Sequence, residues 1–425
     1  MGSSFSRLVL FLYFLHGLNQ ALGFVTVPYL ARTLGPEVYG QVAFAQGLVS
    51  YLLVLVNYSF ELSASRKVAT IDNPEQVTEN IGRVVVAQGF LAALGFGLLL
   101  GLYPVPSVQR TWHLLLPFYG LVIAQAFSLN WLFWGRGLVL LPLLLEMGQR
   151  LLTIVALFLW VRGPEGGFVY ALIASTTALV TSGASWLIAV RFYMGGSPNF
   201  IRRLLPRWAS VSLTLREGWW LFLAQLGSTL TMGGNAFLLG LYTTPIQVAQ
   251  YAAAEKLVIT VSALLNPLFR AFYPRFLRKE QPSPLALGRK ALIAFFLLGV
   301  ILSLGLFLMA SPLVRIVFGP GYEEASSLVR ILAFWIALTA LSTVWGGLFL
   351  VPLGLDRFQT LFVLLGGMFH LTLVFLLAPS LAGIGIAFSL LASASLTAFG
   401  QALFLWQKTG IPPFMGIIRG GKTKE

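Results

Sequence analysis

Charged side chains interrupt two stretches of this sequence that are otherwise long and apolar. Arg150 lies near the middle of one stretch, and Glu146 precedes it by four positions, which places both side chains on one face of a helix. Glu255 and Lys256 are adjacent in the other stretch, so their side chains point about 100° apart on a helix and do not pair with each other. Ionisable residues inside apolar helices are rare because burying a charge is costly, and they therefore mark candidate sites for binding or relaying ions.

The composition excludes most other chemistry. The 425 residues include no cysteine, which rules out disulfides, thiolate metal sites and cysteine nucleophiles, and the three histidines are far apart in sequence. We therefore expect no catalytic residue, no metal site and no cofactor. Only 10% of the residues are charged and 57% are hydrophobic, whereas a soluble domain carries roughly 25% charged residues. The composition indicates an integral membrane protein rather than a soluble enzyme.

Apolar stretches of about 20 residues, the length that crosses a bilayer, recur along the sequence. Short connections rich in turn residues separate them, as at Leu34-Gly35-Pro36. The first stretch is too long for the apolar part of a signal peptide and lacks a clear cleavage site, so we expect it to be retained as a helix. The pattern predicts an all-α protein with about twelve transmembrane helices, near residues 8–31, 39–60, 83–103, 113–134, 138–161, 168–192, 217–241, 248–272, 289–310, 328–350, 359–378 and 382–407.

The longest break between these stretches lies at about residues 193–216 and is rich in Arg, Pro, Ser and Gly. It divides the chain into two halves of about six spans each. We predict an N-terminal six-helix lobe at residues 1–195, a basic cytoplasmic linker at 196–215, a C-terminal six-helix lobe at 216–408 and a basic cytoplasmic tail at 409–425.

The two halves match at an offset of 209 residues. Polar matches are the informative ones because polar residues are rare inside spans, although chance alignment in so apolar a sequence is the alternative explanation. Both copies begin on the same side of the membrane, so the repeat predicts two lobes related by a parallel pseudo-two-fold axis along the membrane normal, an arrangement of some transporters. The polar matches are Pro36 with Pro245, Gln41 with Gln250, Asn57 with Asn266 and Arg66 with Arg275.

Lys and Arg residues fall mainly on one side of the predicted helices. If the N-terminus is inside, about 21 of these cations lie on the inner side and about 5 on the outer side. The positive-inside rule then predicts a multi-pass protein of the cytoplasmic (inner) cell membrane, with both termini in the cytoplasm. Topology thus explains most of the net charge of +14, so no nucleic-acid partner is expected, whereas Arg202, Arg203 and Arg207 should attract anionic membrane lipid.

Four motifs resemble those of one family of membrane proteins. The first motif looks like the first loop of the polysaccharide-type flippases, which belong to the multidrug/oligosaccharidyl-lipid/polysaccharide exporter superfamily. The likeness extends over almost the whole chain in the number and order of the spans. The motifs are Pro28-Tyr29-Leu30-Ala31-Arg32-Thr33-Leu34-Gly35-Pro36-Glu37-Val38-Tyr39-Gly40, Trp131-Leu132-Phe133-Trp134-Gly135, Tyr251-Ala252-Ala253-Ala254-Glu255-Lys256-Leu257 and Phe318-Gly319-Pro320-Gly321-Tyr322.

The resemblance implies two six-helix lobes that form a V around a central cavity. It implies a flippase that moves a polyprenyl-diphosphate-linked oligosaccharide, the repeat unit of a surface polysaccharide such as O-antigen, from the cytoplasmic to the outer leaflet by alternating access. Twelve spans argue against the fourteen-helix peptidoglycan-precursor flippases. Glycan polymerases or glycosyltransferases are candidate partners, and Na⁺, H⁺ or the membrane potential is the candidate driving force.

Cations in such a cavity would carry the diphosphate, because an unpaired phosphate charge in hydrocarbon is prohibitively costly and Arg suits phosphate by its fork of donors. The predicted principal substrate-binding residues are Arg150 and Lys256. A second group of substrate-binding candidates consists of Arg32, Arg83 and Arg270. The supporting polar residues are Glu146, Glu255, Asn57 and Asn266.

Each of these predictions has a structural alternative. Glu146 would orient Arg150 or take part in ion coupling, but the two residues could equally form a neutralising i,i+4 pair. The cations near span ends could reach lipid headgroups instead of substrate, and the two asparagines could bond helix to helix. His16 and His370 are expected to be packed side chains rather than proton relays.

Two other functions remain as alternatives. A drug or cation exporter of the same superfamily matches the span count, although its motifs do not match one by one. A membrane-bound glycan polymerase or ligase is less favoured because it would need a large outer loop or acidic residues placed for catalysis. A major-facilitator carrier is disfavoured because the loop at Glu61-Leu62-Ser63-Ala64-Ser65-Arg66-Lys67 lacks the Gly-rich, Asp-Arg-bearing pattern of that class.

Overall fold

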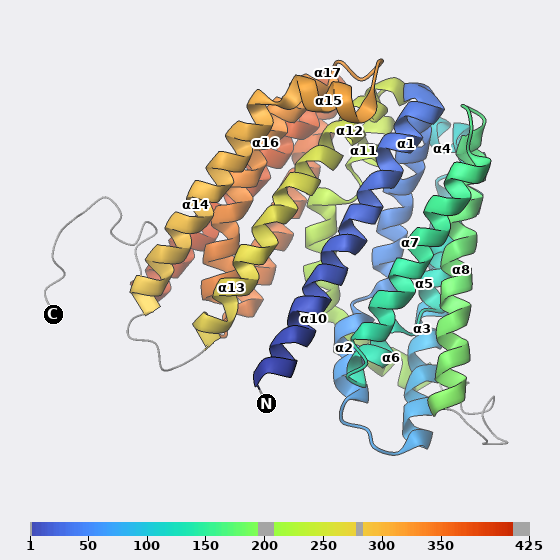
Figure 1. Ribbon diagram of the computed structural model, residues 1–425, viewed down its shortest axis with the longest axis vertical. Helices are drawn as coiled ribbons and strands as arrows, with labels where there is room; N and C mark the ends of the chain where they lie inside the picture. The colour runs from blue at the N-terminus through green and yellow to red at the C-terminus, as the bar shows by residue number, and fades with distance from the viewer. Residues whose placement is uncertain (1, 194–207, 278–283, 411–425) are drawn as a thin grey trace, which may run out of the picture. The chain divides into compact units, whose positions relative to one another are not determined.

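The computed structural model describes residues 2–193, 208–277 and 284–410, and throughout these ranges the secondary structure is helical, with no strand (Figure 1). The prediction of an all-α protein is confirmed. The chain divides into two compact units, Met1–Leu226 and Gly227–Glu425, which are described separately.

Unit 1 contains the first nine labelled helices, of which the last continues into unit 2. Its longest helix, α1, bends at Gly35, where a φ of 73° lies in the left-handed region that glycine adopts at little cost. The helices are α1 (Gly2–Asn57), α2 (Phe60–Val68), α3 (Pro74–Gly101), α4 (Pro106–Arg110), α5 (Trp112–Ala126), α6 (Asn130–Gly135), α7 (Leu140–Trp160), α8 (Gly166–Tyr193) and α10 (Trp208–Met232).

Unit 2 contains the remaining helices. Its last helix, α17, bends at Ala382, which has a φ of 48° and lies three residues after Pro379. The helices are α11 (Asn235–Gly240), α12 (Pro245–Ser262), the 3₁₀ turn η1 (Ala263–Leu265), α13 (Asn266–Leu277), α14 (Pro284–Leu308), α15 (Ala310–Phe318), α16 (Ala325–Ser342), the π-helix η2 (Thr343–Leu350) and α17 (Asp356–Thr409).

Every predicted span overlaps a described helix. Nine helical segments in this part of the chain are long and apolar enough to cross a membrane. The segment Val25–Val68 contains the predicted second span and the end of the first, and Asp356–Thr409 contains the last two on either side of the bend at Ala382. Helix α10, which with α11 overlaps the predicted seventh span, is not one of the nine. Large apolar side chains are widely exposed on these helices, as at Leu187 and Phe192, which fits a surface in contact with lipid rather than water. The protein is a multi-pass membrane protein.

Each unit contains a break in a helix next to the asparagine that the predicted repeat pairs with the other unit. In unit 1, α1 ends at Asn57, and the next two residues, Tyr58 and Ser59, adopt left-handed conformations with φ of 45° and 57°. In unit 2, the 3₁₀ turn η1 interrupts the eighth span immediately before Asn266. Asn57 and Asn266 are the pair related by the 209-residue offset, so the second helix of each half is broken at the corresponding position.

One motif that carried the family resemblance proves to be a packing element. In α6, the carbonyl oxygen of Trp131 accepts a hydrogen bond of 2.8 Å from the Ser65 hydroxyl of α2. Gly135 closes the motif against the same helix, since a Cβ at this position would lie 2.6 Å from the backbone oxygen of Ser65. In contrast, Gly97 and Gly101 in α3 have the GxxxG spacing that allows helices to pack closely. A Cβ at either glycine would meet no atom within 4 Å, so this spacing makes no close helix contact.

This difference predicts opposite outcomes for two glycine substitutions. Gly135→Ala should destabilise the protein by about 1–3 kcal/mol, because α6 would have to move away from the α2 backbone. The matched control Gly97→Ala should leave stability unchanged or slightly raised, because the added methyl group enters open space in a helix interior. Thermal unfolding of both variants in detergent measures the effect, and equal midpoints would contradict the α2–α6 packing.

Candidate functional site

Arg150 in α7 binds the backbone of α1 rather than a carboxylate. Its Nη1 donates a hydrogen bond of 2.9 Å to the carbonyl oxygen of Asn19. The guanidinium lies directly over Gly23, one turn further along α1, and a Cβ there would overlap Nη1. A side chain at position 23 would therefore displace the flexible end of Arg150 from this place on α1.

Asn19 also binds the carboxylate that the sequence places beside Arg150. Its Nδ2 donates to Glu146 Oε2 at 3.2 Å. In the described part of the chain, no carboxylate lies within ion-pair distance of Arg150, so Glu146 and Arg150 do not form the neutralising pair that their spacing allows. The charge of Arg150 thus remains uncompensated by an acid, while Asn19 is 97% buried and its Oδ1 has no hydrogen-bond partner.

A second polar cluster lies in unit 2, where Asn235 links a carboxylate to a histidine. Asn235 Nδ2 donates to Glu255 Oε1 at 2.9 Å, and Asn235 Oδ1 lies 2.9 Å from His370 Nε2. The Tyr251 hydroxyl donates to the same Glu255 oxygen at 3.3 Å. Because an amide oxygen only accepts, His370 Nε2 is the donor in this arrangement. Three helices, α11, α12 and α17, therefore meet at a polar cluster in which Asn235, Tyr251 and His370 are buried and Glu255 is half-buried.

Sequence reasoning found only part of this second cluster. The sequence predicts Glu255 as a supporting residue and His370 as a packed side chain, and His370 is indeed buried. The sequence does not predict the bridging role of Asn235. Asn235 directly follows Gly233-Gly234 in an otherwise apolar segment. Polar residues are rare in such segments, so an amide at this break indicates a buried polar contact.

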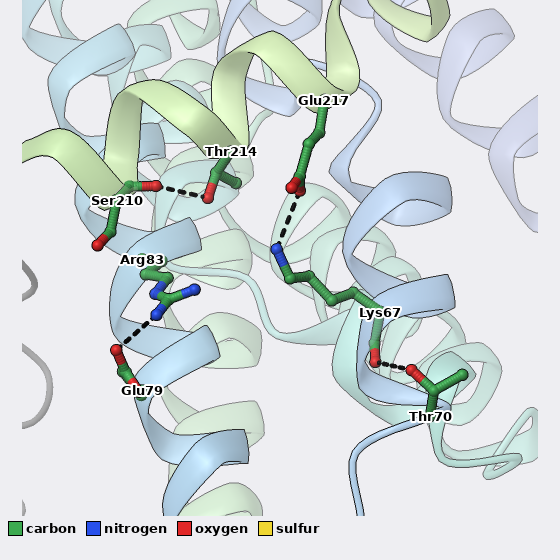
Figure 2. A network of polar contacts seen from close by, with 7 residues as sticks. All are labelled: Lys67, Thr70, Glu79, Arg83, Ser210, Thr214 and Glu217. Atoms are coloured by element: carbon green, nitrogen blue, oxygen red, sulfur yellow. Dashed lines mark hydrogen bonds and ion pairs between the residues drawn. The ribbon is translucent and has the colours of Figure 1, made fainter.

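The other predicted residues lie in varied settings. Lys256 is half-buried in α12, whereas Arg32 and Arg270 are exposed. Arg83 Nη2 lies 2.6 Å from Glu79 Oε1 within α3 (Figure 2). Their roles in binding remain predictions.

The two asparagines related by the repeat lie at broken helix ends. Asn57 ends α1, and its Oδ1 is buried without a hydrogen-bond partner, whereas Asn266 is exposed at the start of α13. The predicted linker is described only from Trp208, where it is helical, and Arg202, Arg203 and Arg207 lie outside the described residues.

Another motif of the resemblance fixes a loop to a helix. Gln250 of α12 donates through Nε2 to the carbonyl oxygen of Gly321 at 2.7 Å and accepts at Oε1 from the amide of Ala325 at 2.9 Å. Tyr322 between them is only 1% exposed. The Glu323 carboxylate accepts from the Gly321 amide at 3.0 Å, and backbone hydrogen bonds of this kind hold the pKa of Glu323 below its usual value. This loop is an anchor for the start of α16.

Comparison with known proteins assigns the chain to a family. The model of the polysaccharide biosynthesis protein family matches residues 6–279. The chain belongs to this family. It is 28% identical over 407 residues to a protein of Escherichia coli (strain K12) that is named as a candidate O-antigen transporter, with 95% of this chain and 97% of that protein covered. A protein of the same name from Shigella dysenteriae is 25% identical over 390 residues, covering 90% of this chain and 95% of that protein.

Solved structures show the same fold at low sequence identity. The lipid II flippase MurJ in an inward closed conformation has a TM-score of 0.74 at 10% identity, covering 93% of this chain and 87% of that protein. An inward-facing multidrug-resistance transporter of the MATE family and MOP superfamily has a TM-score of 0.68 at 15% identity, covering 92% of this chain and 94% of that protein. The family match confirms the resemblance to polysaccharide-type proteins, the two solved structures show the shared fold, and the relatives are named as transporters.

The Asn235 bridge predicts a marked loss of stability when it is removed. Asn235→Leu should lower the free energy of unfolding by roughly 2–4 kcal/mol, because the half-buried Glu255 carboxylate and the buried His370 Nε2 both lose a partner. Glu255→Gln is the matched control, since its side-chain carbonyl still accepts from Asn235 and the protein should stay folded. Unfolding in detergent distinguishes the two variants, and a fully stable Asn235→Leu protein would show that the bridge is dispensable.

Proposed function

We propose that this transporter flips a polyprenyl-diphosphate-linked oligosaccharide, the repeat unit of a surface polysaccharide, from the cytoplasmic to the outer leaflet. The family and its O-antigen-named relatives support a glycan unit as the cargo. The observation that carries the proposal for the headgroup is Arg150, a guanidinium within a membrane-spanning helix whose charge no described carboxylate neutralises.

A diphosphate fits the free hydrogen-bonding capacity of this guanidinium. Arginine has five N–H donors, and Arg150 spends one of them on the Asn19 carbonyl, so four remain for an anion. The contacts of Asn19 and Gly23 also hold the side chain in one place on α1. A pre-oriented, uncompensated guanidinium favours binding of a phosphate anion over a cationic drug.

In the proposed mechanism, binding groups are exposed first to the inner and then to the outer side of the membrane. Arg150 binds the headgroup together with Lys256, while Arg32, Arg83 and Arg270 assist at the ends of the path. The excess of cations on one side of the spans supports an inner-membrane orientation with both termini in the cytoplasm. The substrate would then be collected where cytoplasmic glycosyltransferases make it, and a glycan polymerase would receive it outside.

We propose that the cation that drives transport binds at Glu255, in the polar cluster with Asn235, Tyr251 and His370. Both described donors to this carboxylate, Asn235 Nδ2 and the Tyr251 hydroxyl, bind Oε1, which leaves Oε2 free to take a proton or Na⁺. His370 is fully buried behind Asn235, and its Nδ1 has no hydrogen-bond partner. Exchange of a cation at Glu255 would change the charge within unit 2, and this change could drive the conformational step.

The role of the two cations predicts a selective loss of transport. Arg150→Gln combined with Lys256→Gln should abolish flipping of a diphosphate-linked glycan in reconstituted vesicles, because the cargo's charge would have no partner in the spans. Arg162→Gln, which removes an exposed cation between α7 and α8, is the control and should transport normally. Wild-type rates in a folded double variant would overturn the assignment of these sites.

The coupling proposal predicts a variant that separates binding from driving force. Glu255→Gln should abolish the response of transport to an imposed H⁺ or Na⁺ gradient, since the amide cannot exchange a cation, while headgroup binding at Arg150 persists. Separate H⁺ and Na⁺ gradients across the vesicle identify the ion. The exposed Glu324→Gln serves as the control, and an unchanged gradient response in Glu255→Gln would refute the assignment.

A further inference from the structure

Helix α10 is continuous, yet the two compact units of the chain divide within it. The helix runs over Trp208–Met232, whereas unit 1 ends at Leu226 and unit 2 begins at Gly227. Its first part and its last residues therefore pack in different structural environments.

The burial pattern along α10 shows the same division. In the first part, the buried positions are Val211, Thr214, Gly218 and Phe222, at intervals of three and four residues, which form one stripe on a helix. Gly227, the next buried position, follows Phe222 by five residues, so at about 100° per residue it lies on nearly the opposite face. The helix thus changes its packing face at the boundary between the units.

The stripe of the first part packs on the broken end of α1. The Ser59 hydroxyl donates to the carbonyl oxygen of Leu221 at 2.9 Å. The Tyr58 ring stacks on Phe222, with centroids 4.5 Å apart and planes 11° apart, and a Cβ at Gly218 would lie 3.2 Å from the same ring. The left-handed conformations of Tyr58 and Ser59 place both side chains at α10.

An ion pair adds a further contact beyond this stripe. Lys67 Nζ of α2 lies 3.0 Å from Glu217 Oε2 of α10, and Figure 2 shows the two side chains extended toward each other. Both side chains are partly exposed, so the pair selects the position of α10 along α2 more than it adds stability.

The boundary itself has the composition of a helix bend. Gly227 is followed by Ser228, and Gly/Ser pairs are among the recognised causes of sharp bends in helices. Within unit 2, a Cβ at Gly227 would lie 2.8 Å from the Leu364 Cα, and one at Gly367 would lie 2.7 Å from the Gly227 carbonyl oxygen. The residues after the boundary are therefore fixed to α17 as closely as those before it are fixed to α1 and α2.

We propose that residues 208–226 of α10 move as part of unit 1 during transport, with Tyr58, Ser59, Lys67 and Glu217 as positioning residues, and that the helix bends at Gly227-Ser228. The motion in question is the alternation described under Proposed function, on which this inference rests. The consequence is that the moving boundary lies inside helix α10.

Cross-linking tests the proposal, and the cysteine-free chain offers a background without other thiols. In the double variant Lys67→Cys/Glu217→Cys, a short bifunctional thiol reagent would join α2 to α10 at the position of the ion pair. The cross-linked protein should flip its glycan substrate with no loss of rate relative to the same protein after reduction. A loss of transport that reduction restores would overturn the proposal, and each single-cysteine variant controls for modification alone.

A spin-label measurement tests the docking without relying on the cargo. Labels on Leu62→Cys and Leu213→Cys, exposed positions on α2 and on the first part of α10, should give one distance that is unchanged by substrate or an imposed ion. Two distances, or a shift, would overturn the proposal. A second pair, Leu62→Cys with Leu376→Cys of unit 2, reports the alternation itself. If neither distance changes, the alternation on which the proposed function depends does not occur. The docking of the first part of α10 on unit 1 would still stand.

Discussion

The cost of placing charge inside a bilayer is the constraint on which the rest of this structure depends. Hydrocarbon offers no water to solvate an ionised group, so each such group needs a partner within the protein. Each unit meets this need with an asparagine. The side-chain amide of Asn19 binds Glu146, while its backbone carbonyl, which any residue could supply, accepts from Arg150. The side chain of Asn235 binds Glu255 and His370.

An asparagine suits this position because it donates and accepts without adding charge. In unit 2, the Asn235 side chain both donates, to Glu255, and accepts, from His370, so its nitrogen and its oxygen each have a partner. In unit 1, Oδ1 of Asn19 stays without a partner, and Arg150 keeps donors to spare. The first arrangement is suited to holding a carboxylate that exchanges a small cation, and the second to receiving an anion.

The sequence predicts the spans well because their signal is local. Runs of apolar residues of the right length are visible without any knowledge of neighbours. The repeat at polar positions pairs Asn57 with Asn266, and the structure shows a helix break next to each of them. The partners of the buried charges are not local. Helical spacing suggests that Glu146 pairs with Arg150, but Asn19, 131 positions from Arg150, determines what each of them binds. Asn235 and His370 are 135 positions apart, and nothing in either segment indicates that they meet.

The motifs that resemble the family are informative about the fold for the same reason. Gly135 allows α6 to lie on α2, and Gln250 anchors the loop at Gly321, so these residues are restricted by packing rather than by a ligand. Such motifs identify the family and its architecture, while the proposal for the cargo rests on the charge of Arg150.

The continuity of α10 shows how packing can divide a molecule where the sequence does not. A polar, basic segment suggests that the halves separate before the seventh span, since loops commonly separate domains. The break after Asn57 instead presents Tyr58 and Ser59 to the first part of α10, and Gly227 faces α17 from the opposite side of the same helix. A helix whose two parts pack on different faces can follow a movement of either packing partner only where a small residue lets the backbone bend. In this chain that residue is Gly227, because it lies at the point where the packing face changes.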